Sequence, residues 1–243
     1  MIEKTDIKDF FQVVQERRSV RIFDPKEAFD HHIVQKCLEA STLAPNSSNM
    51  QLWEFYRMPE TSPNKAKLAQ LCMGQKAATT ARELVVIVTR RDLWKSRAKA
   101  NEAYIRDCYK DAEPKKLKRA LSYYTNLVPK LYAKILFWST IKQIIAWLVG
   151  LKRPMVRQVS NADVRISVHK SAALAAMTFM YAMKAEGYDT CPMEGFDSKR
   201  VKKLLGLPSG AEINMIIGCG KGLPDGIYGD RFRLPNEEVI FLK

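Results

Sequence analysis

The sequence predicts an α+β fold, in which a central mixed or antiparallel sheet of few strands is flanked by helices. Two apolar runs, residues 84–89 and 212–218, are typical of strands that are covered on both faces. Residues 160–186 keep helical periodicity up to Gly187, a residue type that commonly ends helices. The 243 residues suffice for a sizeable core. We expect one domain, residues 1–243, with a helical insertion at about residues 92–159.

Periodicity and capping residues define the other elements in chain order. Asp30 is a typical N-cap for a helix that Pro45 ends. Ser62 and Pro63 start a helical stretch that Gly74 interrupts. We expect helices over residues 7–15, 31–43, 62–82 and 198–205, strands over residues 53–57 and 239–242, and a polar loop over residues 46–49.

The insertion is helical and basic. Residues 94–111 are largely polar and predict a solvent-facing helix, whereas residues 131–151 are nearly all apolar apart from Lys134, Lys142 and a few neutral polar side chains. A helix that is apolar all round must be covered. We expect a partner subunit or an active-site lid to cover it. The alternative is weak peripheral contact of residues 131–157 with a membrane surface. A membrane span is less favoured, because each lysine inside it costs about 2.5–3.5 kcal/mol.

The formal net charge of +14 is compatible with nucleic acid, an anionic membrane surface or acidic small molecules. The basic groups lie mainly in residues 110–119, 130–157 and 199–203. They do not interleave aromatic with basic side chains, as a base-stacking surface does. We therefore expect no nucleic-acid partner.

Cysteine and histidine usage points to a reducing compartment without a metal. The five cysteines are scattered and never spaced as Cys-x-x-Cys, which argues against a disulfide framework and a zinc site. The three histidines have no ligand spacing, so we expect no metal. Residues 1–6 contain acids and no apolar core, so we expect no signal peptide and a cytoplasmic protein. No hydrolytic triad or paired acids emerge, and residues 218–229 do not form a dinucleotide fingerprint.

Residues 16–24, with the sequence Glu-Arg-Arg-Ser-Val-Arg-Ile-Phe-Asp, are the best candidate for a binding site. Each guanidinium in this turn can bind a phosphate through two parallel hydrogen bonds, and the serine adds a neutral one. The alternative is a solvated basic turn. Phe23 and Pro25 follow directly and place the arginines beside apolar packing, which favours an anion site.

Four motifs in this order resemble those of the FMN-dependent nitroreductase superfamily. They are Arg17-Arg18-Ser19-x-Arg21-x-Phe23, the run from Ala44 to Trp53, the run from Pro192 to Asp197, and Arg231-Phe232-Arg233-Leu234-Pro235. The resemblance implies a nitroreductase-like fold and an intertwined homodimer with shared FMN sites. It also implies NADH or NADPH as electron donor and a small nitroaromatic, quinone or similar electron-poor molecule as acceptor.

The resemblance also assigns candidate residues. It assigns no catalytic side chain, because the flavin carries the chemistry, and places the backbone of Glu194 and Gly195 near flavin N5. Gln75 would reach the pyrimidine edge, although an exposed helix position explains it equally well. The implied cofactor-binding residues are Arg17, Arg18, Ser19, Arg21, Pro45, Asn46, Ser47, Asn49, Gln75, Pro192, Glu194, Gly195, Arg231 and Arg233. Among these, Pro45, Asn46, Ser47 and Asn49 would come from the other subunit.

Three features depart from the family pattern, and they leave alternatives open. Asn46 replaces a common serine and Leu52 a common proline, and the insertion is long and apolar. One alternative is a basic peripheral protein that binds a membrane surface and keeps a vestigial flavin site. Another keeps the flavin but changes the reaction to reductive dehalogenation or to fragmentation of the flavin.

Overall fold

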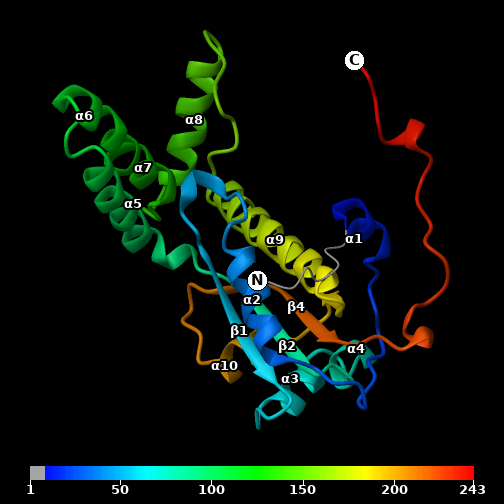
Figure 1. Cartoon of the computed structure of the whole chain (residues 1–243). Coiled ribbons are helices and arrows are strands. Elements are labelled where there is room, and N and C mark those ends of the chain that lie inside the picture. The colour runs from blue at the N-terminus through cyan, green and yellow to red at the C-terminus, as the bar shows by residue number, and fades with distance from the viewer. Residues whose placement is uncertain (1–8) are drawn as a thin grey trace.

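The structure is a computed structural model that describes residues 9–243, and its centre is a four-stranded antiparallel sheet flanked by helices (Figure 1). The predicted α+β fold is therefore confirmed. The strands are β1 (Trp53–Pro59), β2 (Glu83–Thr89), β3 (Asp189–Met193) and β4 (Glu212–Gly220). The α-helices are α1 (Phe10–Glu16), α2 (His31–Ser41), α3 (Lys65–Leu71), α4 (Lys76–Thr79), α5 (Trp94–Cys108), α6 (Pro114–Ser122), α7 (Val128–Tyr132), α8 (Trp138–Gly150), α9 (Asn161–Ala185) and α10 (Ser198–Leu204). Five short helical turns complete the structure, namely η1 (Ser47–Asn49), η2 (Arg91–Leu93), the π-helical η3 (Tyr123–Leu127), η4 (Pro224–Gly226) and η5 (Asn236–Glu238).

The strands are ordered β1-β2-β4-β3, and all three neighbouring pairs are antiparallel. Strand β3 was not predicted, and it contains Pro192, a residue type that lacks an N–H and is found in sheets mainly on edge strands. The structure explains the exception. Strand β3 is the last strand of the sheet, where Pro192 pairs with Ile217 of β4, and no further strand of the sheet follows it among the described residues.

Helices cover both faces of the sheet, as the continuous apolar character of β2 predicted. Val85 and Ile87 pack with α2 and α9 on one face, and Leu84, Val86 and Val88 pack with α3, α4 and α10 on the other. Every residue of β2 is buried. Helix α4 approaches so closely that a Cβ on Gly218 of β4 would lie 2.3 Å from Ala77 O, so this position requires glycine.

One carboxylate is buried within this framework. Glu83 of β2 is 0% exposed and accepts hydrogen bonds from Arg57 Nε at 2.6 Å and Arg57 Nη2 at 3.1 Å. Its Oε2 also lies 2.6 Å from Nδ1 of His31, the first residue of α2. These contacts join α2 to the sheet and compensate the buried charge.

Helix α9 runs along the sheet and begins and ends as its sequence predicts. The Ser160 hydroxyl accepts a hydrogen bond from Asp163 N at 3.0 Å, and the Asp163 carboxylate accepts one from Ser160 N at 2.9 Å. The hydrogen bond that the Ser160 hydroxyl donates to the Asp163 carboxylate at 2.6 Å, followed by that of the Ser160 N–H, lowers the pKa of Asp163. Gly187 follows the helix at φ +78°, a conformation that favours glycine.

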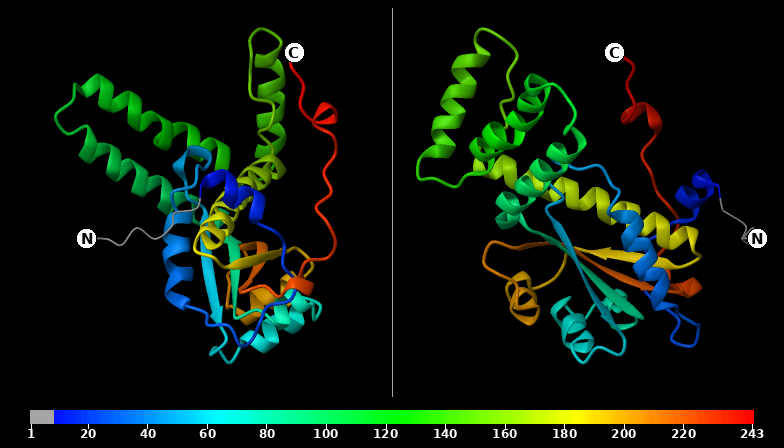
Figure 2. Two further views of the ribbon diagram at one scale, coloured as in Figure 1. Left: turned by 45° about the vertical axis from the view of Figure 1, so that its right-hand side comes forward. Right: turned by 60° about the vertical axis from the view of Figure 1, so that its left-hand side comes forward.

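Residues 91–150 contain η2, α5, α6, η3, α7 and α8, and these helices extend beyond the sheet (Figure 2). The expected continuous helix over residues 131–151 is wrong. Ala133 leaves the helical conformation at ψ 132° and Phe137 is left-handed at φ 59°, so α7 and α8 are separate helices. Within residues 9–243, no helix combines the length and the apolar character that crossing a membrane requires.

The segment after β4 is irregular. Residues 228–243 are all exposed and contain only the single turn η5, so the expected strand over residues 239–242 is wrong. At the other end, α1 replaces the helix expected over residues 7–15, and Ile7 lies outside the described residues. The other predicted elements are found within a few residues of their expected bounds.

Candidate functional site

The arginine turn of residues 17–24 is held between strand β3 and the segment that follows β4. Ser19 forms a parallel bridge with Thr190, and Phe23 forms an antiparallel bridge with Gly222. Val20 and Phe23 are each 1% exposed and anchor the turn in the core. The backbone N–H of Arg21 donates to Gly226 O at 2.8 Å. Segments that are about 200 residues apart in the sequence therefore meet at this turn.

The meeting point is a cleft of about 160 Å³, which we call the arginine cleft. Its lining residues are Arg17, Arg18, Ser19, Arg21, Ile227, Tyr228, Asp230, Arg231, Phe232 and Arg233. Arg18 Nη2 donates to Gly229 O at 2.9 Å, and Arg231 Nη2 donates to Arg17 O at 2.6 Å. The Arg21 guanidinium lies 5.0 Å from the centre of the Tyr228 ring. The structure thus brings together all six residues that the first and fourth motifs contributed.

Positive charge in the arginine cleft exceeds negative charge. Among residues 9–243, five arginines line it, and Asp230 is its single carboxylate. Burial, followed by repulsion from Arg18, Arg233 and Arg17, lowers the pKa of Arg231. Within the described chain, the buried Nε of Arg17 has no hydrogen-bond partner. Such a cluster of cationic donors is suited to a doubly charged anion such as a phosphate monoester.

A second group lies where β3 leads into the loop before α10. Gln75 Nε2, at the start of α4, donates to Gly195 O at 2.8 Å and to Cys72 O at 2.9 Å. A Cβ on Gly195 would lie 3.2 Å from this nitrogen. Glu194 and Gly195 are both exposed. The sequence-predicted positions 75, 194 and 195 are therefore neighbours, and β3 separates them from the arginine cleft.

The polar loop over residues 46–49 lies elsewhere in the same chain. Ser47 N donates to Ser171 Oγ of α9 at 3.1 Å, and Asn49 exchanges two hydrogen bonds of 3.0 Å with Asn101 of α5. Pro45, Asn46, Ser47 and Asn49 do not line the arginine cleft. One chain therefore does not unite all of the predicted residues, and the expectation that this loop serves a second subunit stays a prediction.

Two contributors were missed by the sequence analysis. Tyr228 lies beneath Arg21, and the hydroxyl Oγ1 of Thr190, beside Ser19, is buried without a hydrogen-bond partner in the described chain. The segment 218–229 was considered only as a phosphate-binding glycine loop. Tyr228 lies three residues before Arg231 in the sequence, and this proximity could have indicated an aromatic side chain in the cleft.

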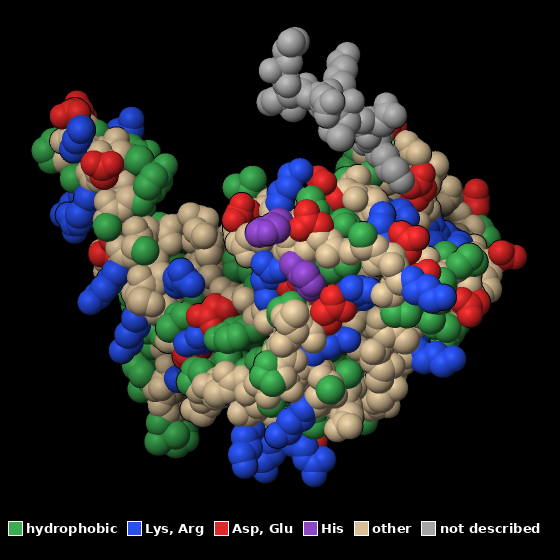
Figure 3. Space-filling model, turned by 60° about the horizontal axis from the view of Figure 1, so that its bottom comes forward, with side chains coloured by type: hydrophobic (Ala, Val, Ile, Leu, Met, Phe, Trp, Pro, Cys, Tyr) green, Lys and Arg blue, Asp and Glu red, His purple; other side chains and the backbone are tan. Residues whose placement is uncertain are grey.

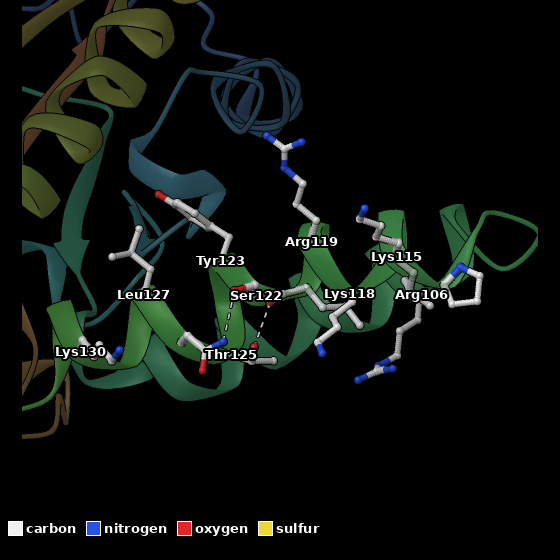
Figure 4. Close-up of a pocket in the computed structure, with 13 residues that line it drawn as sticks. Arg106, Lys115, Lys118, Arg119, Ser122, Tyr123, Thr125, Leu127 and Lys130 are labelled. Carbon is white, nitrogen blue, oxygen red and sulfur yellow. Dashed lines mark hydrogen bonds between the residues drawn. The ribbon is translucent and has the colours of Figure 1, made fainter.

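A larger hollow, about 920 Å³, lies on the helical part of the molecule and shares no residue with the arginine cleft. Five of its lining residues are basic, namely Arg106, Lys115, Lys118, Arg119 and Lys130, and none is acidic. Figure 4 shows Lys118 and Arg106 directed away from Arg119, so these charges do not converge on one point. We therefore regard the arginine cleft as the candidate functional site.

The cysteines differ in exposure. All five are free; Cys108 is exposed and the other four are buried. Burial raises the pKa of Cys37 to about 12 and the pKa of Cys72 to about 11. Among residues 9–243, no group of three or more His, Cys, Asp or Glu side chains could hold a metal ion.

Comparison with known proteins gives a consistent result. A family model described as Nitroreductase family matches residues 14–221. Protein DrgA of Synechocystis sp. is 28% identical over 218 residues, which cover 89% of this chain and 86% of the relative. YdgI of Bacillus subtilis, assigned as an NAD(P)H nitroreductase, is 26% identical over 233 residues, or 95% of this chain and 96% of the relative. A protein of Exiguobacterium sibiricum assigned as a nitroreductase, solved in complex with FMN, superposes with a TM-score of 0.67 at 23% identity, covering 97% of this chain and 98% of that chain.

Proposed function

The chain belongs to the nitroreductase family, and from this premise we propose that it is an FMN-dependent NAD(P)H oxidoreductase. Its acceptors would be nitroaromatic, quinone or similar electron-poor molecules. The observation that carries the proposal is the arginine cleft, whose five arginines outnumber one carboxylate. The FMN complex of the structural relative and the NAD(P)H assignment of the sequence relative support the cofactor and the donor.

The residues present fit FMN. The cleft offers cationic donors, including the buried Nε of Arg17 that lacks a partner within the described chain, and the FMN phosphate is a dianionic acceptor. Arg17, Arg18, Ser19 and Arg21 would bind the phosphate, the ribityl chain and the ring edge, and Arg231 and Arg233 would complete the phosphate clamp. FMN supplies the hydride chemistry when bound.

The protein would orient the ring and tune its charge. Gln75 would face the pyrimidine edge, and the backbone of Glu194 and Gly195, behind Pro192, would face N5. A guanidinium fixed at the ring edge stabilises negative charge there without reorganising during the reaction. The same site would first accept a nicotinamide donor and then the acceptor.

We also propose that two chains share each site. Cofactor pockets usually enclose about 300–1,000 Å³, whereas the arginine cleft encloses about 160 Å³. A partner that contributes Pro45, Asn46, Ser47 and Asn49 would supply the missing wall. The exposed apolar side chains at both chain ends, such as Phe11 and Phe241, are candidates for the dimer interface. The free thiols fit a reducing compartment, and we propose the cytoplasm.

The purified full-length chain tests the cofactor assignment. It should be yellow and release FMN on denaturation, and the apoprotein should be reconstituted by added FMN. Turnover with NADH and NADPH, against a nitroaromatic, a quinone and a halogenated aromatic, then identifies the acceptor class. Colourless protein that FMN does not reconstitute would exclude the proposed function.

Mixing two defective variants tests the shared site. A variant without Arg17 and a variant without Asn49 should each bind FMN weakly. A refolded mixture contains dimers in which one site has both intact residues, so binding should partly recover. If the mixture binds no better than the separate variants, each site is built by one chain.

A further inference from the structure

Helix α8 has an inverted distribution of polar and apolar side chains. Its single charged residue, Lys142, is 8% exposed and donates from Nζ to Leu131 O at 2.8 Å. Its large apolar side chains instead point into solvent. They form a surface that we call the α8 ridge, which consists of Ile141, Ile144, Ile145, Trp147 and Leu148, exposed by 42–58%. A surface helix normally turns its apolar side inward, so the ridge requires a non-aqueous partner.

The fold holds α8 in this orientation. At its base, Trp138 Nε1 donates to Lys130 O at 2.7 Å, and Ser139 Oγ accepts from Asn161 N at 3.0 Å. At its far end, Arg157 Nη2 donates to Gly150 O at 2.9 Å and ties the returning segment to the helix. The helix projects away from the sheet (Figure 1). The ridge is therefore braced from its inner side and directed outward.

The charges around the α8 ridge are positive and favour a partner of negative charge. Residues 114–162 contain ten Lys and Arg and no Asp or Glu. Exposed Lys134 precedes α8, and exposed Lys152 and Arg153 follow it. On the face of the body that Figure 3 shows, by contrast, acidic and basic side chains intersperse. Two copies of the ridge would place like charges side by side, whereas an anionic surface would neutralise them.

We propose that the α8 ridge docks into the interface of an anionic lipid bilayer. Its isoleucines and Trp147 lie at the boundary between headgroups and acyl chains, and Lys134, Lys152 and Arg153 contact the headgroups. The 13 residues of α8 rise about 20 Å at about 1.5 Å each. This is shorter than the roughly 30 Å hydrocarbon core, so the helix lies in the interface. The docking is independent of the flavin chemistry.

Sedimentation of the full-length chain with vesicles tests the proposal. The protein should bind vesicles of phosphatidylcholine mixed with phosphatidylglycerol, bind phosphatidylcholine alone much more weakly, and be released by salt. Lys152→Gln/Arg153→Gln should weaken binding about 25-fold, because each basic residue near an anionic surface contributes about fivefold. Ile144→Gln/Leu148→Gln should weaken it by more than about tenfold. The matched control, Lys199→Gln/Lys203→Gln on α10 at the opposite end, should bind like the parent.

Trp147 gives a second readout, because its fluorescence should shift to the blue on vesicle addition and Trp147→Phe should lose most of that shift. The proposal is wrong if the folded parent does not bind anionic vesicles. It is also wrong if the α10 control weakens binding as much as the α8 variants, which would indicate general charge attraction. If the parent does not bind vesicles and the α8 variants instead change the oligomeric state, the ridge is an interface between two copies of the chain.

Discussion

Replacing Arg21 by alanine should separate FMN affinity from protein stability. The side chain is exposed, and its described contact is the Tyr228 ring at 5.0 Å, which contributes about 0.5–1 kcal/mol at exposed sites. The backbone N–H that donates to Gly226 O is unchanged by the substitution. The free energy of unfolding of the apoprotein should therefore fall by no more than about 1 kcal/mol.

The affinity should fall further. A hydrogen bond to a charged group contributes about 1.5–3 kcal/mol, so Arg21→Ala should weaken FMN binding about tenfold to a hundredfold in a fluorimetric titration. Arg21→Lys keeps the charge and loses the two-pronged geometry. If Arg21 contacts the phosphate, the FMN affinity of Arg21→Lys should lie between those of the parent and of Arg21→Ala. If Arg21 contacts the ring edge, the affinity of Arg21→Lys should be close to that of the parent. Arg200→Ala on α10 is a matched exposed control. If Arg21→Ala binds FMN as tightly as the parent, the cleft is a solvated basic surface and the central assignment is wrong.

Three further predictions concern stability and reactivity. Glu83→Ala leaves Arg57 without its buried partner and should cost about 3–5 kcal/mol in urea denaturation, whereas a cost below about 1 kcal/mol would contradict a structural ion pair. Ser160→Ala removes the α9 cap and should cost about 0.5–2 kcal/mol at neutral pH. Hydrogen bonds from Ser160 lower the pKa of Asp163, so the stability they contribute is present above the ordinary pKa of 3.8 and is lost as the pH falls through the folded-state pKa. The difference in unfolding free energy between the parent and Ser160→Ala should therefore shrink in acid. An unchanged difference would exclude this linkage. Cys108→Ser should abolish the fast reaction of the folded protein with a thiol reagent near pH 8. The four other thiols are buried, and the raised pKa values of Cys37 and Cys72 keep these two protonated. A fast reaction that persists in the variant would show that a buried thiol becomes exposed to the reagent.

The elements that the sequence predicted well are those in which local and tertiary preferences agree. Strand β2 is apolar throughout because both faces are covered, and α9 carries its own cap and its terminal glycine. Strand β3 was missed. It contains Pro192, which a sheet tolerates at an edge, and edge position is a property of the assembled sheet. The break before α8 was missed because Phe137 adopts a left-handed conformation without a glycine to signal it.

The candidate site was predicted in part for similar reasons. Charge and motif identified Arg17, Arg18 and Arg21, since these residues are adjacent in sequence. The placement of Arg231 beside Arg17 O came from the motif resemblance, and no local pattern encodes such a contact between distant residues. The inverted face of α8 was also unpredictable, because Lys142 finds its hydrogen-bond acceptor at Leu131 only after the chain has turned at Phe137.

The arginine cleft joins residues that are 211 and 214 positions apart in the chain. The sheet, by contrast, is complete at Gly220, before any residue of the second half of the cleft has been made. During synthesis on the ribosome the sheet strands and α9 therefore all emerge ahead of Tyr228, Arg231 and Arg233. A nascent chain that stops short of these residues contains every strand of the sheet and only half of the anion site. Affinity for the anion should therefore appear late in synthesis, once residues 227–233 have joined residues 17–21.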